Sequence, residues 1–170
     1  VISITVLTLT LGVDTLLVVR NITRGGWQDG VVSSLGICSG LFIHAAISAV
    51  GISLILLQTA WAFNALKLAG ACYLIWLGIG SLRQALQGQS SPQLNSNAEQ
   101  QTFNAVRSFR EGLLSNVLNP KTVIFYMAFL PQFIDPQHSA MAQSLLLALL
   151  HFVIAMVWQC SLAVVFAKAK

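Results

Sequence analysis

Charged residues are scarce in this chain of 170 residues. They make up 8% of it, whereas hydrophobic residues make up 56%. A typical soluble domain has about 25% charged residues, so this imbalance excludes an ordinary soluble globular fold. A helix needs about 20 mostly apolar residues to cross a bilayer, and several such stretches fit into the chain. The composition therefore predicts an all-α, polytopic membrane helix bundle.

The residue patterns of catalytic and metal sites are also missing. The three cysteines, Cys38, Cys72 and Cys160, are widely spaced, and each lies within an apolar run. They form no Cys-X-X-Cys or mixed Cys/His spacing that would hold a metal ion, and no Ser/His/Asp arrangement suggests a hydrolase. We therefore expect no enzyme, no catalytic residues, no cofactor and no metal. The net charge of +4 needs no nucleic-acid partner, because the cytoplasmic loops of membrane proteins are basic.

Five apolar stretches are long enough to cross a bilayer. They cover residues 1–19, 31–57, 60–82, 112–134 and 142–167. A polar loop at 20–30 separates the first two, and residues 83–111, rich in Gln, Ser and Asn, predict a solvated and partly disordered linker. The predicted organisation is a first transmembrane repeat of three helices at 1–82, the linker at 83–111, and a second repeat at 112–170 with two helices.

The positive charges orient these crossings. If successive loops alternate sides, one side receives seven Lys or Arg residues, while the turn at Gln58 and Thr59 and the 135–141 loop on the other side contain none. Loops with an excess of Lys and Arg face the cytoplasm. We therefore expect the N-terminus outside and the 83–111 linker in the cytoplasm.

The fourth stretch contains an adjacent proline and lysine, Pro120 and Lys121. Proline donates no backbone hydrogen bond, so it frees the carbonyl of Asn116, and it moves Asn119 away from helical geometry. Within a bilayer such defects are tolerated only where protein or a water-filled cavity satisfies the backbone. A lysine at that depth is by default a sign of a functional site. The sequence therefore predicts an interrupted helix that forms part of a binding site.

The first stretch has a similar interruption. The run 11–15, Leu-Gly-Val-Asp-Thr, aligns with 118–122, Leu-Asn-Pro-Lys-Thr, so that Asp14 and Lys121 occupy matching places with opposite charge. Gly12 permits a break before Asp14. Because the two stretches cross in opposite senses, this is the inverted-repeat plan of many transporters, whose sites lie where two broken helices meet.

These two charges fit an amino acid, which carries one carboxylate and one ammonium. The helix beginning at Pro120 directs the positive end of its dipole, with Lys121 beside it, at a carboxylate, and Asp14 can meet an ammonium or take up a proton. The predicted substrate-binding residues are Asp14, Lys121, Asn116, Asn119, Pro120 and Gly12. The alternative is a structural Asp14–Lys121 ion pair, which is expensive in lipid.

His44 lies on a face of small residues with Gly36, Gly40 and Ser48, spaced every fourth position. Small residues at this spacing let helices approach closely, so we expect this face to point into the bundle. His44 is therefore a candidate to line the pathway or relay protons. The alternative is a hydrogen-bonded core histidine.

Several of these motifs resemble the LysE/RhtB family of amino-acid exporters. The run 116–121, Asn-Val-Leu-Asn-Pro-Lys, followed by Leu-Pro-Gln-Phe at 130–133, is similar to the second-half motif of that family. Arg-Gly-Gly at 24–26 and Lys-Leu-Ala-Gly at 67–70 are similar to its first half. The resemblance covers nearly the whole chain. It implies a secondary transporter of the bacterial inner membrane that exports amino acids or their derivatives in exchange for protons, as a homodimer.

Two departures from the family pattern keep alternatives open. The first-half motif Thr-Pro-Gly-Pro-Asp reads Thr-Leu-Gly-Val-Asp at 10–14 here, without either proline, and the sixth crossing of the family does not follow the fifth. A truncated, non-transporting membrane protein is one alternative. A divalent-cation transporter of similar architecture is another, but it would need several oxygen or nitrogen ligands, and Lys121 would repel a cation.

Overall fold

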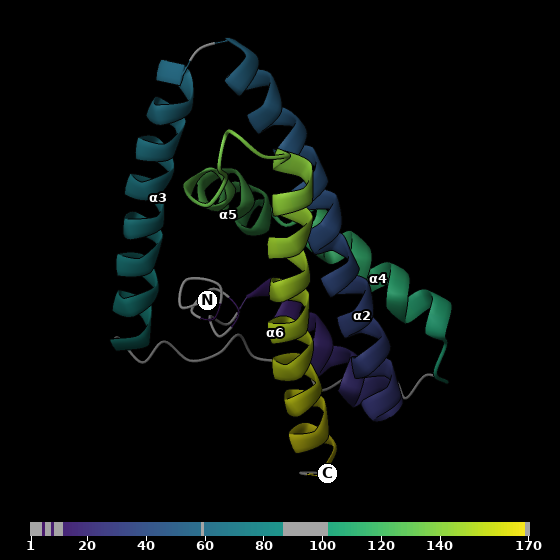
Figure 1. Cartoon of the computed structure of the whole chain (residues 1–170). Helices are drawn as coiled ribbons and strands as arrows, with labels where there is room; N and C mark the ends of the chain where they lie inside the picture. The colour runs from purple at the N-terminus through teal and green to yellow at the C-terminus, as the bar shows by residue number, and fades with distance from the viewer. Residues whose placement is uncertain (1–4, 6–7, 9–11, 59, 87–101, 169–170) are drawn as a thin grey trace. The chain divides into compact units, whose positions relative to one another are not determined.

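The computed structural model of the protein describes residues 5, 8, 12–58, 60–86 and 102–168. These residues form helices and connecting turns without a β-strand (Figure 1). The elements are α2 (Val13–Gln58), α3 (Ala60–Leu86), α4 (Ala105–Val117), α5 (Pro120–Phe129), the short 3-10 helix η1 (Leu130–Gln132) and α6 (Ala140–Lys168). The predicted all-α class is confirmed.

Two described helical segments are long and apolar enough to cross a membrane, Val13–Ile55 within α2 and Ala140–Val165 within α6. A third is added if α4 and α5, which follow each other across a two-residue break, form one span. The described residues of all five predicted stretches are mostly helical, since α3 covers the third stretch and the first continues into α2. The structure thus has the long apolar helices that the composition predicted for a membrane protein.

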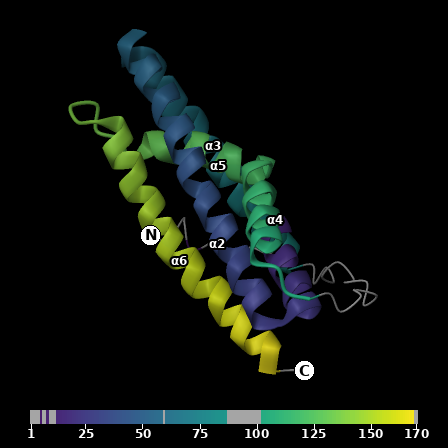
Figure 2. The same ribbon diagram turned by 90° about the vertical axis from the view of Figure 1, so that its right-hand side faces the viewer.

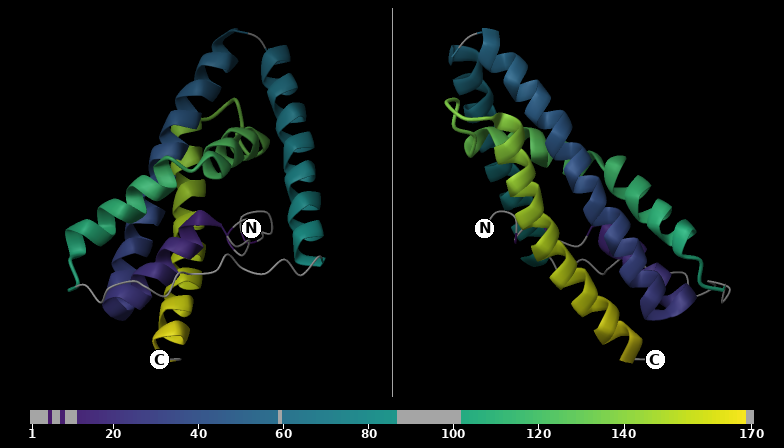
Figure 3. Two further views of the ribbon diagram at one scale, coloured as in Figure 1. Left: turned by 180° about the vertical axis from the view of Figure 1, so that it is seen from behind. Right: turned by 45° about the vertical axis from the view of Figure 1, so that its right-hand side comes forward.

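The polar loop predicted at 20–30 is not an extended loop. Both flanks of this segment are helical, and the chain turns at Gly26, whose φ of 81° and ψ of −171° interrupt α2 (Figure 3). Glycine adopts a positive φ without a steric penalty. Next to the turn, a Cβ at Gly25 would overlap the side chain of Asp29, and a Cβ at Gly30 would overlap that of Ile22. The two parts of α2 therefore pack tightly against each other on both sides of the turn.

The chain divides into two compact units. The described residues of Val1–Leu41, Leu94–Asn119 and Leu149–Lys170 form the first unit, and those of Phe42–Gln93 and Pro120–Ala148 form the second. Helices α2 and α6 contribute to both. The predicted division into two transmembrane repeats and a linker stays a prediction. Residues 87–101 of the linker lie outside the described part, and α4 begins at Ala105, within the predicted linker, where the side chain of Asn104 accepts a hydrogen bond from the Arg107 amide.

The first unit has a small apolar core of Val18, Ile22, Ile37 and Ala163, from α2 and α6. Helix α4 lies directly against α2 (Figure 2). A Cβ at Gly36 would overlap the backbone oxygen of Phe109, and one at Gly112 would overlap the backbone oxygen of Ser33. Small residues allow such backbone contact between helices, and the contact fixes which side chains of α4 face α2.

The second unit is held by close packing of α3 on α5 and η1. Gly70 of α3 lies against the backbone of Ala128, and Nε2 of Gln132 donates a hydrogen bond to the backbone oxygen of Lys67. The rings of Phe125 and Phe129 stack with centroids 4.8 Å apart, and Phe133 follows at 4.5 Å from Phe129. Aromatic pairs at these distances stabilise the local structure of α5 and the turn that follows it.

The predicted interruption in the fourth stretch is confirmed. Helix α4 ends at Val117 and α5 begins at Pro120. The carbonyl of Asn116, which would have bonded to residue 120, accepts the N–H of Asn119 at 3.0 Å, and the carbonyl of Leu114 accepts that of Leu118 at 3.0 Å. The protein itself therefore satisfies the carbonyl that Pro120 releases, as the interior of a membrane requires.

Candidate substrate-binding site

Asp14 lies in the first turn of α2, next to Gly12, which precedes the helix. The carbonyl of Gly12 accepts the N–H of Leu16 at 3.1 Å and so closes that first turn. A carboxylate at a helix N-terminus interacts favourably with the positive end of the helix dipole. The side chain of Asp14 is half-buried, so it is held by the fold yet still accessible.

Three side chains, two from the last turn of α4 and one from the break that follows it, donate hydrogen bonds to the Asp14 carboxylate. Ser115 Oγ donates to Oδ1 at 2.9 Å, Asn116 Nδ2 donates to Oδ2 at 2.9 Å, and Asn119 Nδ2 lies 3.4 Å from Oδ2. Hydrogen bonds to an ionised carboxylate are stronger than neutral ones. The structure thus brings together Asp14, Asn116 and Asn119 of the predicted set and adds Ser115, which the sequence analysis missed. All four belong to the first unit.

Gly40 makes room for the central donor of this cluster. Asn116 is 2% exposed, and a Cβ at Gly40 would come within 2.5 Å of its Oδ1. Any larger residue at Gly40 would push the carboxamide away from its present orientation. The run of small residues that the sequence shows on this face of α2 therefore serves the Asp14 cluster as well as helix packing.

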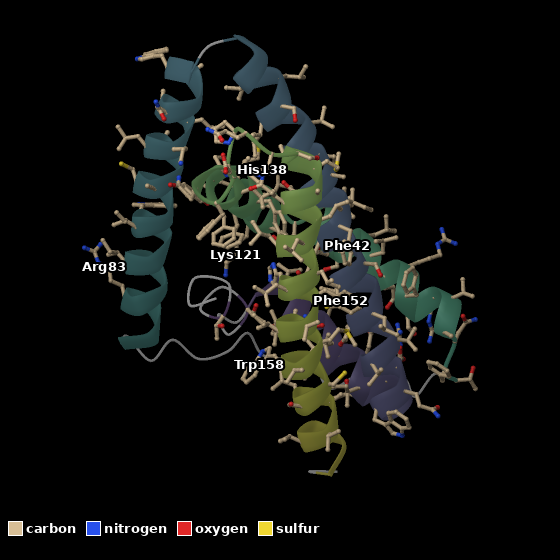
Figure 4. The ribbon with its side chains drawn as sticks, in the orientation of Figure 1. Phe42, Arg83, Lys121, His138, Phe152 and Trp158 are labelled. Atoms are coloured by element: carbon tan, nitrogen blue, oxygen red, sulfur yellow. The ribbon has the colours of Figure 1, made fainter. Side chains whose placement is uncertain are left out.

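Pro120 and Lys121 form the first turn of α5. Pro120 is exposed and Lys121 is partly buried. Figure 4 shows Lys121 on this helix. They belong to the second unit, whereas Asp14 belongs to the first. The interruption that frees the N-terminus of α5 is present. The predicted pairing of Asp14 with Lys121 around a substrate is not tested and stays a prediction.

His44 is buried in the second unit, where its ring lies 5.9 Å from that of Tyr126 between centroids, at an interplanar angle of 33°. It therefore points into protein, as the small-residue face predicted. A role in the pathway or in proton transfer stays a prediction.

A second polar cluster, which the sequence analysis did not identify, surrounds Arg24. Its guanidinium donates to both oxygens of Asp29, at 3.0 and 3.1 Å, and to both oxygens of Glu111, each at 3.0 Å. Arg20 donates to Glu111 at 2.8 Å from a more exposed position. The side chain of Asp29 is 0% exposed. Buried charges are tolerated when they are paired and hydrogen-bonded in this way.

Neutral side chains complete this Arg24 cluster. Asn21 donates to Ser33 at 2.6 Å and to Glu111 at 3.1 Å, and the hydroxyl of Ser108 donates to Asp29. Ser108, Glu111 and Ser115 follow one another on one face of α4, so the same face serves both clusters. The sequence signal for this cluster is the spacing of these three polar residues on one face of a helix, directly before an apolar run. The sequence analysis did not use this signal, because it treated Arg20 and Arg24 as charges of a solvated loop.

Comparison with known proteins assigns the family. The sequence model of the LysE type translocator family matches residues 5–170. The chain belongs to this family. Its members are transporters rather than enzymes, and the translocator is accordingly a membrane protein.

Individual relatives agree with this assignment. The translocator is 34% identical to the uncharacterized membrane protein YrhP of Bacillus subtilis, over 94% of this chain and 77% of the relative. It is 36% identical to the homoserine/homoserine lactone efflux protein of Salmonella typhimurium, over 90% of this chain and 71% of the relative. It is 28% identical to the threonine efflux protein of Salmonella typhi, over 94% and 76%. No solved structure matches the chain.

Proposed function

We propose that this LysE-type translocator exports amino acids or amino-acid derivatives across the bacterial inner membrane in exchange for protons. Relatives named for efflux of homoserine and threonine support an amino-acid substrate. In this proposal the N-terminus lies outside, the 83–111 linker lies in the cytoplasm, and the protein forms a homodimer.

The observation that carries the proposal is the hydrogen-bonded Asp14 carboxylate in a chain with only 8% charged residues. A carboxylate accepts about four hydrogen bonds in all. Asn116 and Asn119 donate to Oδ2, whereas Oδ1 accepts only the bond from Ser115 among the described contacts. Oδ1 can therefore accept a further bond from the ammonium of a substrate. Its three donors hold the carboxylate in position, so that little conformational freedom is lost when the substrate binds.

The other end of an amino acid requires a positive group. The N-terminus of α5 begins with Pro120 and carries Lys121 in its first turn. Unpaired N–H groups and the helix dipole favour an anion at such an end, and an ammonium adds a full charge. We assign the substrate carboxylate to Lys121 and the start of α5, and a proton-relay role to His44.

The chemistry of the Asp14 cluster does not favour a divalent cation. Ser115, Asn116 and Asn119 direct hydrogen-bond donors at the carboxylate. A calcium or magnesium site would direct several oxygens at one point instead. The amino-acid assignment is therefore preferred over cation transport.

The test is efflux from cells that are loaded with amino acids as dipeptides and express the complete protein. Asp14→Asn and Lys121→Ala should each abolish release of the amino acid that the unmodified protein exports, with normal amounts of protein in the membrane. Asp135→Asn, which changes an exposed acidic residue outside the helices, is the control and should export normally. Undiminished release by both site variants would refute the assignment of the site.

A further inference from the structure

Helix α6 buries a stripe of small and polar side chains. The buried positions are Ser144, Ala148, His151, Ala155, Gln159 and Ala163. The other faces of this helix carry exposed apolar residues such as Val153 and Val157. Polar side chains on a helix long and apolar enough to cross a membrane are costly and commonly functional. The two largest polar groups of the stripe, His151 and Gln159, therefore need an explanation.

Among the described residues, the ring of His151 has a hydrogen-bond partner, whereas the side-chain oxygen of Gln159 has none. Nε2 of His151 lies 3.3 Å from Oγ1 of Thr8. Gln159 is 5% exposed, and its Oε1 has no hydrogen-bond partner within the part of the chain that the structure describes. A buried acceptor without a donor costs free energy that a satisfied one does not. Gln159 thus presents an acceptor that a donor from outside the protein could use.

The described contacts of α6 with the start of the chain lie on both sides of Gln159. Thr8 lies next to His151, and further along the chain Val18 and Ile22 pack with Ala163. The order of these contacts along the chain is therefore the same as their order along α6. In the sequence, Asp14 lies between Thr8 and Val18. On α6, Gln159 lies between the residues that they contact, His151 and Ala163. Both residues belong to the first unit.

We propose that Gln159 is a specificity-determining residue, whose Oε1 accepts a hydrogen bond from a side-chain hydroxyl of the substrate. This inference rests on the proposed function. Asp14 and Lys121 are assigned to the ammonium and the carboxylate, so the remaining donor on an amino acid is its side chain. A neutral amide oxygen suits a neutral O–H donor, and a site that hydrogen-bonds a substrate hydroxyl discriminates against the analogue that lacks it. The predicted substrates are hydroxylated aliphatic amino acids.

The experiment compares homoserine with norvaline, which has a methyl group in place of the hydroxyl. The complete protein is reconstituted into liposomes, and kcat/KM is measured for each amino acid. The unmodified protein should prefer homoserine by about twofold to tenfold, the usual range for one neutral hydrogen bond. Gln159→Met, of similar length but without the acceptor, should lose this preference through slower homoserine transport while norvaline transport is unchanged. Gln143→Met, on the same helix but hydrogen-bonded to Asp135, is the control and should keep the preference.

Gln159→Asn is a second variant, which tests the inference if Gln159→Met fails to fold. It keeps the amide but withdraws the oxygen by one methylene, so it too should lower the preference for homoserine. A wild-type ratio in either Gln159 variant would overturn the inference and leave the proposed function standing, since both amino acids would still be exported. An unmodified protein that transports both amino acids equally would also overturn it. Failure of the unmodified protein to transport any amino acid would remove the proposed function itself.

Discussion

The carboxylate of Asp14 and the side-chain amide of Asn116 are joined by a hydrogen bond of 2.9 Å, although 102 positions separate them in the chain. The bond connects the first turn of α2 to the last turn of α4. Asn116 is also the residue whose carbonyl Pro120 releases from the helix. One residue thus contacts Asp14 through its side chain and takes part in the break between α4 and α5 through its backbone.

Asn116→Leu should weaken substrate binding strongly. It removes a charge-assisted hydrogen bond from Asp14, and such bonds contribute about 1.5–3 kcal/mol. We expect the KM for export to rise by about tenfold to a hundredfold, since about 1.4 kcal/mol corresponds to a factor of ten. Asn64→Leu, at an exposed position on α3, is the matched control and should leave KM unchanged. Equal KM values in the two variants would contradict the role of Asn116.

Asp29→Asn should destabilise the protein more than any other single neutralisation of an acidic residue outside the Asp14 cluster. The Asp29 side chain is fully buried against Arg24, and breaking a buried ion pair costs about 3–5 kcal/mol. Thermal unfolding in detergent should occur at a clearly lower temperature. Asp135→Asn, at an exposed site, should lower the unfolding temperature much less. A shared midpoint for both variants would show that the Arg24 cluster does not support the fold.

Gly36→Ala should disrupt the contact between α2 and α4, whereas Gly51→Ala should not. A Cβ at Gly36 would overlap the backbone oxygen of Phe109, while a Cβ at Gly51 would meet nothing within 4 Å. Overpacking costs about 1–3 kcal/mol, but replacing an unconstrained helical glycine by alanine gains about 1 kcal/mol. The measurement is the thermal midpoint of each variant. A rise for Gly36→Ala would mean that the two backbones are not in contact.

The loop before α6 should respond to acid. The pKa of Asp135 is lowered below its ordinary value of 3.8, first by the backbone N–H of Gln137 and then by the side chain of His138. A lowered pKa means that the ionised carboxylate stabilises the loop above the ordinary value, and that this stabilisation is lost as the pH falls through the lowered pKa. Hydrogen exchange at the Gln137 amide should therefore be slow at about pH 5 and accelerate relative to Asp135→Asn only at lower pH. Identical profiles in the two proteins would show that this hydrogen bond does not form.

Local sequence signals predicted the elements that depend on local chemistry. Pro120 interrupts the fourth stretch because a proline removes one donor wherever it occurs, and this effect needs no knowledge of the fold. The same reasoning failed at residues 20–30. A cluster of polar residues and two glycines is typical of a loop, but a single residue, Gly26, makes the turn and the flanking residues stay helical.

Contacts between distant residues were the part that the sequence could not supply. Asp29 lies on α2 and Glu111 on α4, and each resembles an ordinary loop or linker charge until Arg24 is seen between them. The sequence around Ser115 does not indicate that its hydroxyl bonds to Asp14, because serine occurs at many kinds of position in helices. The predicted meeting of Asp14 with Asn116 and Asn119 was reached instead from the expectation of two broken helices.

Binding of a labelled amino acid to the purified complete protein tests the central claim most directly. The substrate is the one whose efflux is observed in cells, and the comparison is between the unmodified protein, Asp14→Asn and the exposed-site control Asp135→Asn. If Asp14 holds the substrate ammonium, binding should be saturable in the unmodified protein and in the control and should disappear in Asp14→Asn. Unchanged affinity in Asp14→Asn, with the protein folded, would contradict the account.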